Sequence, residues 1–321
     1  MAAGRRSTAE KEIAMLQSME LLFNFLIFPG FLFSAIIGLM ACWVDRKVTA
    51  RLQWRKGPPW HQNFTDIIKL LGKEIIVPEG AKITFLSAPC LGFLSLVLAA
   101  TILGRAVFLS GGSFSGDLIV VVYLLTIPAI SLIIGGSSSR NPLASVGASR
   151  EMKLVLAYEL PFLLAAITVI VKSGGQIRLA EIIGQQAVVG AHIFSFSGAL
   201  ALFVMLFCSI GKLGLGPFEV SEAEQEIMAG VLIEYSGPPL AVFKLSKALL
   251  LYIMPLFLAL LFMGRDLSPL LLALKYISLL VAIILVKNTN PRLRIDQVIR
   301  FFWGPVTILA SLAVILSLLG Y

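Results

Sequence analysis

Residues 83–109 read ITFLSAPCLGFLSLVLAATILGRAVFL, an apolar run of 27 residues in which the single charged residue, Arg105, lies near the end. A helix needs about 20 apolar residues to cross the roughly 30 Å of hydrocarbon in a bilayer, so this run is long enough to span a membrane. Similar runs recur along all 321 residues, of which 58% are apolar and 14% charged, with no polar stretch of domain length between them. The sequence therefore predicts one all-α integral membrane domain, residues 1–321, and excludes a soluble enzyme with a single anchor.

Eight apolar stretches of this kind predict a polytopic membrane protein with eight transmembrane helices. The predicted spans are residues 21–44, 83–109, 118–137, 152–171, 191–211, 240–263, 267–286 and 298–319. Basic residues gather in the loops on one side, which by the positive-inside rule is cytoplasmic, so both termini are expected outside a cell membrane. Arg5, Arg6 and Lys11 argue mildly against this orientation. The net charge of +8 then comes from the basic loops on the cytoplasmic side of the membrane. No stacking aromatic residues alternate with these basic residues, so we expect no nucleic-acid partner.

The connection between the first two spans predicts an additional cytoplasmic amphipathic helix. Apolar residues from Phe64 to Ile75 recur at near-helical spacing, with Asp66, Lys69 and Lys73 between them. The preceding RKGPPW, residues 55–60, predicts a turn, because its two prolines lack backbone donors and restrict their neighbours. The alternative interpretation is a solvated linker face.

The few metal-binding residue types are scattered. Cys42, Cys90 and Cys208 all lie in apolar runs without C-x-x-C spacing, and His61 and His192 are far apart in the sequence. We therefore expect no metal, iron-sulfur cluster or haem on this chain, and no disulfide framework. The first twenty residues lack a small-residue cleavage site, so a cleaved signal peptide is not expected.

Charged residues inside apolar spans are costly and usually mark polar pathways. Glu159 lies about two turns into the fourth predicted span, next to Pro161, and Lys275 lies near the middle of the seventh. Proton handling is the functional interpretation of Glu159, and packing against a lysine is the structural one. The structural alternative for Lys275 is a pair with a carboxylate, whereas Arg105, Lys244 and Lys247 lie close enough to span ends to reach water.

The connection at residues 216–239, hereafter the acidic connection, holds five glutamates and no basic residue. If it is helical from Ser221 onward, Glu219, Glu222 and Glu226 share one face. Like charges so close together raise each other's affinity for protons, which would suit proton relay. A solvated acidic loop is the alternative.

Four segments in succession resemble blocks of one known family. They are DRKVTARLQWRKGPP with the following DIIKLLGKE, then NPLASVGASREMKLVLAYELP, PFEVSEAEQEIMAGVLIEYSGPPLAVFKL and NPRLRIDQVIRFFW. These segments resemble the eight-helix membrane subunit that joins the redox arm to the membrane arm in respiratory complex I and in membrane-bound hydrogenases. Two features favour the hydrogenase branch, including sulfane sulfur reductases and formate hydrogenlyases, over the quinone-binding complex I branch. The loop that follows Gly57 is shorter than in typical complex I members, and the lysines Lys244 and Lys247 resemble the hydrogenase pattern.

The resemblance implies roles for particular residues. A proton path would include Glu159, Glu219, Glu222, Glu226 and Glu234, to which we add Lys275. The redox arm would dock on Arg46, Lys47, Arg140, Arg150, Arg292, Arg294, Asp296 and Gln297. For both Arg140 and Arg150, a positive-inside anchor is an equally good interpretation.

The resemblance also implies partners. Hydrogenase-like large and small subunits on the cytoplasmic side would carry the nickel-iron centre and iron-sulfur clusters, and antiporter-like membrane subunits would move protons or sodium. This chain would be a coupling subunit, neither catalytic nor cofactor-binding. The alternatives are a complex I subunit with a quinone pocket, a passive membrane anchor, and a stand-alone ion-coupled transporter, which the absence of matching sequence halves disfavours.

Overall fold

The computed structural model describes residues 15, 18–78, 82–108, 113–264 and 269–320. The positive residues Arg5, Arg6 and Lys11, the span end predicted at Leu109 and the span start predicted at Leu267 lie outside the described residues. In the described part the chain is helical, with no strand. The prediction of an all-α polytopic membrane protein is confirmed.

Seven described helical segments are long and apolar enough to cross a membrane. They are Ser18–Leu52, Lys82–Phe108, Asp117–Ser138, Pro142–Lys172, Gly237–Phe262, Leu270–Thr289 and Ile295–Leu318. The remaining predicted span is α9 (Phe196–Lys212), whose 17 residues extend about 26 Å. It starts five residues later than predicted, because His192–Phe194 forms the short helix η1 and Ser195 caps α9 by accepting from the Gly198 amide.

Some of these spans are continuous helices, whereas others are interrupted. The bounds of their helices are α2 (Phe31–Leu52), α4 (Lys82–Phe108), α5 (Asp117–Leu124), α6 (Ile127–Ser138), α7 (Pro142–Lys172), α11 (Gly237–Phe262), α12 (Pro269–Thr289), α13 (Ile295–Phe301), η3 (Phe302–Val306) and α14 (Thr307–Leu318). The third span is broken between α5 and α6, where a new helix begins at Ile127 with Pro128 in its first turn. The last span widens into the π-helical turn η3, which contains Pro305. Proline has no amide to donate, so the regular hydrogen-bond ladder is interrupted there.

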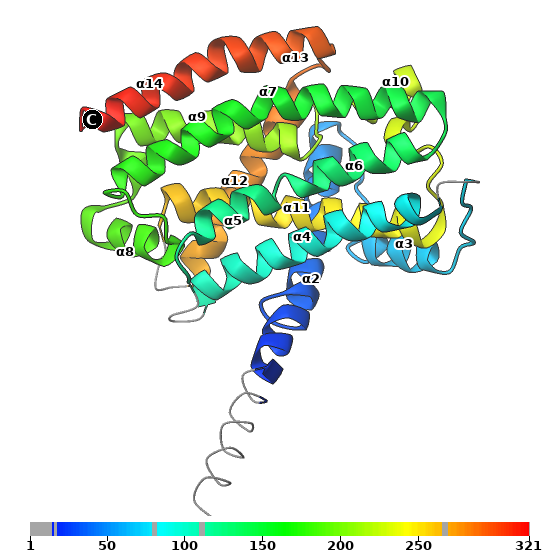
Figure 1. Ribbon diagram of the computed structural model, residues 1–321, viewed down its shortest axis with the longest axis horizontal. Helices are drawn as coiled ribbons and strands as arrows, with labels where there is room; N and C mark the ends of the chain where they lie inside the picture. Colours follow the sequence, from blue (N-terminus) through cyan, green and yellow to red (C-terminus); the bar gives the residue numbers. More distant parts are fainter. Residues whose placement is uncertain (1–14, 16–17, 79–81, 109–112, 265–268, 321) are drawn as a thin grey trace, which may run out of the picture.

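Shorter helices connect the spans. They are α3 (Gln62–Leu71), α8 (Leu179–Val189), α10 (Glu224–Ile227) and η2 (Gly230–Leu232). The predicted amphipathic helix is confirmed as α3, although Ile75 lies beyond its end at Leu71. In Figure 1, α3 and α10 lie at one end of the bundle and α8 lies at the other.

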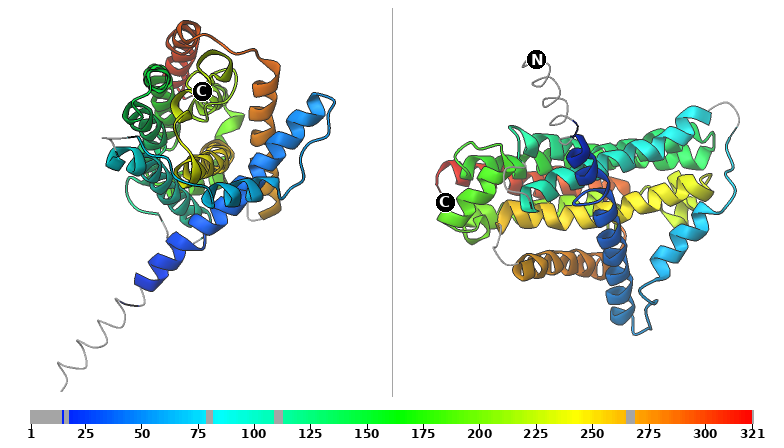
Figure 2. Two further views of the ribbon diagram at one scale, coloured as in Figure 1. Left: turned by 90° about the vertical axis from the view of Figure 1, so that its right-hand side faces the viewer. Right: turned by 90° about the horizontal axis from the view of Figure 1, so that it is seen from below.

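α11 is the central helix of the molecule. It packs against α2, α4, α9 and α12, and 89% of its most apolar window is buried. The long helices α4, α7, α11 and α14 run in roughly one direction, whereas α2 crosses them steeply (Figures 1 and 2). This arrangement places the C-terminal end of α9 and the N-terminal half of α11 next to the acidic connection, where the charged residues gather.

Candidate functional site: two ion pairs and a small cavity

Glu159, the glutamate predicted inside the fourth span, pairs with a lysine from another helix. Lys212 Nζ lies 2.7 Å from Glu159 Oε2, and Thr126 Oγ1 donates to Glu159 Oε1 at 3.0 Å. Thr126 lies at the break between α5 and α6, so this interruption of the third span supplies a hydroxyl to the site. Both carboxylate oxygens of Glu159 therefore have partners. We call Glu159 and Lys212 the inner pair.

The Lys212 side chain is almost completely buried, at 1% exposed, whereas the Glu159 side chain is 22% exposed. Lys212 Nζ lies 4.4 Å from the ring centroid of Phe162 and 5.0 Å from that of Tyr158. The negative faces of aromatic rings attract a cation. Lys212 is also the last residue of α9, where the helix dipole is negative. These contacts explain how a lysine is accommodated here.

A second ion pair, the outer pair, joins the acidic connection to α11. Lys247 Nζ contacts Glu222 Oε2, and the two side chains are 39% and 18% exposed respectively. Between the outer and inner pairs lies a cavity of about 30 Å³. Its charged and hydroxyl-bearing lining residues are Ser131, Glu151, Lys212, Ser221, Glu222, Ser246 and Lys247. This volume holds about two water molecules, and the lining offers them polar partners.

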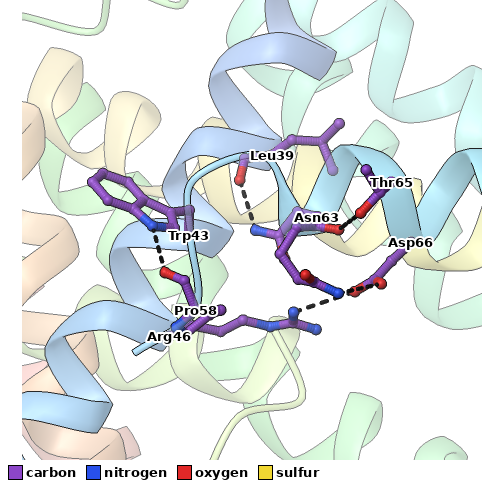
Figure 3. Close-up of polar contacts among 8 residues, drawn as sticks. Leu39, Trp43, Arg46, Pro58, Asn63, Thr65 and Asp66 are labelled. Atoms are coloured by element: carbon purple, nitrogen blue, oxygen red, sulfur yellow. Dashed lines mark hydrogen bonds and ion pairs between the residues drawn. The ribbon is translucent and has the colours of Figure 1, made fainter. Parts of the chain in front are cut away.

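The outer pair also borders an open pocket of about 270 Å³ between α2, α3 and α11. Figure 3 shows how α3 is held there: Asn63 Nδ2 donates to the Leu39 carbonyl at 3.0 Å, and Arg46 lies 3.4 Å from Asp66. Asn63 is the buried residue of α3, so a polar contact fixes this helix to α2. Glu222 and Lys247 line both the open pocket and the small cavity and therefore lie between them.

The acidic connection is folded differently from the prediction. The expected helix from Ser221 onward is wrong, because α10 covers only Glu224–Ile227 and ends at Met228, whose φ is +58°. Glu219, Glu222 and Glu226 do not form the expected stripe, and each of them, like Glu234, has its own partner. These contacts are Glu219–Arg292 at 3.3 Å, Glu222–Lys247, Glu226–Arg150 at 2.5 Å and Glu234–Asn141 at 2.6 Å. The hydrogen bond from Arg150 lowers the pKa of Glu226 below its ordinary value.

Four of the residues predicted to dock the redox arm come together. Arg150, Arg292, Arg294 and Asp296 line one surface pocket of about 360 Å³, next to Glu226. Gln297 supports this surface, because its side-chain oxygen accepts from the Arg294 amide at 3.1 Å where α13 begins. The other three predicted docking residues lie elsewhere. They are Arg46 and Lys47 on α2, and the exposed Arg140 before α7.

Lys275 lies apart from the two ion pairs. Its Nζ donates to the carbonyls of Met263, at 2.6 Å, and Gly264, at 3.5 Å, just beyond the last residue of α11. A cation is favourable at this end of a helix because the helix dipole is negative there. The structure therefore brings Lys212 of the inner pair and Glu222 of the outer pair to one cavity, and places Lys275 at the opposite end of α11.

Sequence reasoning missed three residues of the site. Lys212 was one of the basic residues assigned to the cytoplasmic loops, Lys247 was expected to reach water from a span end, and Glu151 was not singled out, yet all three line the cavity. One signal was available: Lys212 directly follows the predicted span 191–211, and Glu151 directly precedes the span 152–171. Among the described residues, no group of three His, Cys, Asp or Glu side chains is placed to hold a metal ion.

Comparisons with known proteins cover nearly the whole chain. Residues 24–318 match the family model described as NADH dehydrogenase. A curated relative, the H subunit of the NADH-quinone oxidoreductase of Thermomicrobium roseum, is 32% identical over 311 residues, which cover 88% of this chain and 91% of the relative. The protein of the same name from Dehalococcoides mccartyi is 32% identical over 301 residues, covering 89% of this chain and 82% of the relative.

A solved structure also resembles this one. It is a chain of the membrane-bound sulfane sulfur reductase, an archaeal respiratory membrane complex. The TM-score is 0.84 and the identity is 30%, covering 92% of this chain and 99% of the other.

Proposed function

This chain belongs to the NADH dehydrogenase family, and from that premise we propose that it couples a soluble redox arm to ion translocation in a membrane-bound respiratory complex of the hydrogenase type. It is homologous to the corresponding membrane subunit of complex I-like complexes and to a chain of the sulfane sulfur reductase complex. In this function the chain itself carries no redox centre. It contributes a charged path across part of the membrane and a surface on which the redox arm docks.

The observation that carries the proposal is the sequence of charged groups from the open pocket to the membrane interior. The outer pair borders the pocket, the cavity follows, and the inner pair lies beyond it. Buried ion pairs contribute little to net stability, because desolvation offsets their attraction. The largely buried inner pair and the partly exposed outer pair flank a cavity that can hold water, and this arrangement favours a role in moving charge over a role in holding helices together.

The partners are proposed from the docking surface. The pocket formed by Arg150, Arg292, Arg294 and Asp296 is strongly charged and lies on the predicted cytoplasmic side. Hydrogenase-like large and small subunits, with a nickel-iron centre and iron-sulfur clusters, would dock there, and antiporter-like membrane subunits would lie beside the bundle. Glu219 and Glu226 interact with Arg292 and Arg150, so redox-dependent movement of the docked arm would reach the acidic connection directly.

The second candidate is the quinone-chamber subunit of an NADH:quinone oxidoreductase. The names of the curated relatives favour it. The open pocket is compatible with it, because ligand sites for apolar molecules are mostly apolar and most of the lining surface here is apolar, although half of the lining residues are charged. The charged residues are Asp45, Arg46, Asp66, Glu222, Lys244 and Lys247.

The test is to purify the native complex through a tag on this chain and compare Glu159→Gln and Glu222→Gln complexes in proteoliposomes. We expect both to retain redox turnover and assembly but to lose ion translocation. Unchanged translocation per turnover in both variants would show a passive anchor. Metal analysis of the wild-type complex separates the remaining candidates: nickel with iron indicates a hydrogenase, iron without nickel indicates a sulfur- or quinone-reducing relative, and a complex without either metal indicates a stand-alone transporter.

A further inference from the structure

Glu151 is a buried carboxyl group that the proposed path has not used. It lies on α7, eight residues before Glu159, and is 3% exposed. Eight residues correspond to about 12 Å along a helix. The side chain therefore lies more than two turns from the inner pair, on the side of the outer pair.

One oxygen of Glu151 lacks a partner inside the protein. Among the described residues, Glu151 Oε2 has no hydrogen-bond partner. An unsatisfied buried polar atom lowers stability, and a bare buried charge lowers it further. Ser221 is the hydroxyl neighbour of this carboxyl, and Glu151 lines the cavity together with Lys212, Glu222 and Lys247. A water molecule in the cavity, or a proton on the carboxyl, would satisfy the free oxygen.

The inner and outer pairs do not reach each other without an intermediate. Glu222 of the outer pair lines the cavity, but Glu159 of the inner pair does not. The inner pair reaches the cavity only through Lys212. The groups that face Glu151 across the cavity are Glu222 on the acidic connection, Lys247 on α11 and Lys212 on α9, while α6 contributes only the Ser131 hydroxyl. Glu151 is thus the only carboxyl group lining the cavity, among the described residues, that is not held in an ion pair.

We propose that Glu151 is a further protonatable residue of the path, which takes up a proton from water beside the outer pair and releases it to water beside the inner pair. In the uptake step, the carboxylate accepts a proton from a protonated water molecule and becomes a neutral carboxyl, leaving one water. Release is the reverse, so no bond other than O–H forms or breaks. This inference deepens the proposed function and rests on it.

The experiment compares assembled complexes that carry Glu151→Gln, Glu151→Asp and the matched control Glu181→Gln. Glutamine keeps the size and hydrogen-bonding capacity of glutamate but cannot exchange a carboxyl proton. Glu181 is a partly exposed glutamate of α8, paired with Arg178, at the opposite end of the bundle. Two readouts are taken on each complex: ions translocated per redox turnover in proteoliposomes, and the infrared difference band of a protonated carboxyl on turnover.

We expect Glu151→Gln to lose translocation and the carboxyl band while keeping turnover and assembly, Glu151→Asp to restore both readouts in part, and Glu181→Gln to match wild type. Normal translocation in Glu151→Gln, or a band that persists in it, overturns the role of Glu151. If Glu222→Gln still uncouples the complex in that case, the proposed function stands without Glu151. If Glu159→Gln, Glu222→Gln and Glu151→Gln all translocate normally, the proposed function fails and this inference fails with it.

Discussion

Replacing Lys212 by methionine tests whether the inner pair is a compensated pair of buried charges. The substitution keeps a long flexible side chain but removes the cation that lies 2.7 Å from Glu159. Removing one partner of a buried ion pair typically costs about 3–5 kcal/mol, because the other charge is left without compensation. Glu159 is 22% exposed and retains the Thr126 hydroxyl, so we expect the lower end, about 3 kcal/mol.

At about 2 °C per kcal/mol for a large chain, this loss lowers the unfolding temperature by about 6 °C. The assay is thermal unfolding of the detergent-solubilised complex, followed by tryptophan fluorescence. Adding Glu159→Gln to Lys212→Met makes both partners neutral, and we expect this double variant to recover most of the loss. Lys153→Met, at an exposed position of α7, is the matched control and changes stability by less than about 0.5 kcal/mol.

The reasoning is refuted if the double variant is as unstable as Lys212→Met alone. That result would mean that the loss comes from packing of the lysine stem against aromatic rings, and that the two charges are not coupled. Glu159→Gln alone is informative as well, because it leaves the more deeply buried partner unpaired. We expect it to cost at least as much as Lys212→Met.

Three further predictions concern the surroundings of the site. Asn63→Ala removes the side-chain hydrogen bond that fixes α3 to α2, and we expect a loss of about 1–2 kcal/mol and faster hydrogen exchange across α3; unchanged exchange would contradict the anchoring role. Gly147→Ala places a Cβ 2.8 Å from a backbone nitrogen of η2, which displaces the acidic connection at a cost of about 1–3 kcal/mol and lowers translocation per turnover; normal coupling would show that the connection tolerates the shift. Arg150 lowers the pKa of Glu226, so in the wild type their pair persists above that lowered pKa and is lost as the pH falls through it. In Arg150→Gln the carboxyl should protonate at higher pH, as carbon-13 NMR of labelled glutamate would show, and an unmoved titration would refute the pairing.

The spans were predictable because they depend on a local quantity, the length of an apolar run. Even so, the break at Thr126 and the π-helical turn at Pro305 were not assigned, although Pro128 and Pro305 mark them in the sequence. The late start of α9, at residue 196 and not 191, was missed because the apolar content of residues 191–195 does not reveal that they form a short helical turn and a cap. Periodicity did identify α3, since its apolar and charged residues alternate with the period of a helix.

The partners in the site were not predictable, because they come from distant parts of the chain. Glu159 and Lys212 are 53 residues apart, and Arg150 and Glu226 are 76 apart. The acidic connection shows why local spacing misled. A helix would have placed like charges on one face, whereas the folded chain turns at Met228 and gives each glutamate of the predicted path a separate partner, which lowers the repulsion.

The position of α11 has a consequence for how the protein is made. In the finished molecule 89% of its most apolar window is covered by other parts of the chain, yet that segment has a mean hydropathy of 2.1, as high as that of α4, which is 50% buried. Contact with lipid in the folded state does not account for this composition. During synthesis, however, each helix enters the bilayer before its neighbours have packed around it. The Ser246 hydroxyl must therefore be buried, and Lys247 paired, after α11 has been inserted. Until the bundle closes around α11, its apolar half keeps the helix in the membrane.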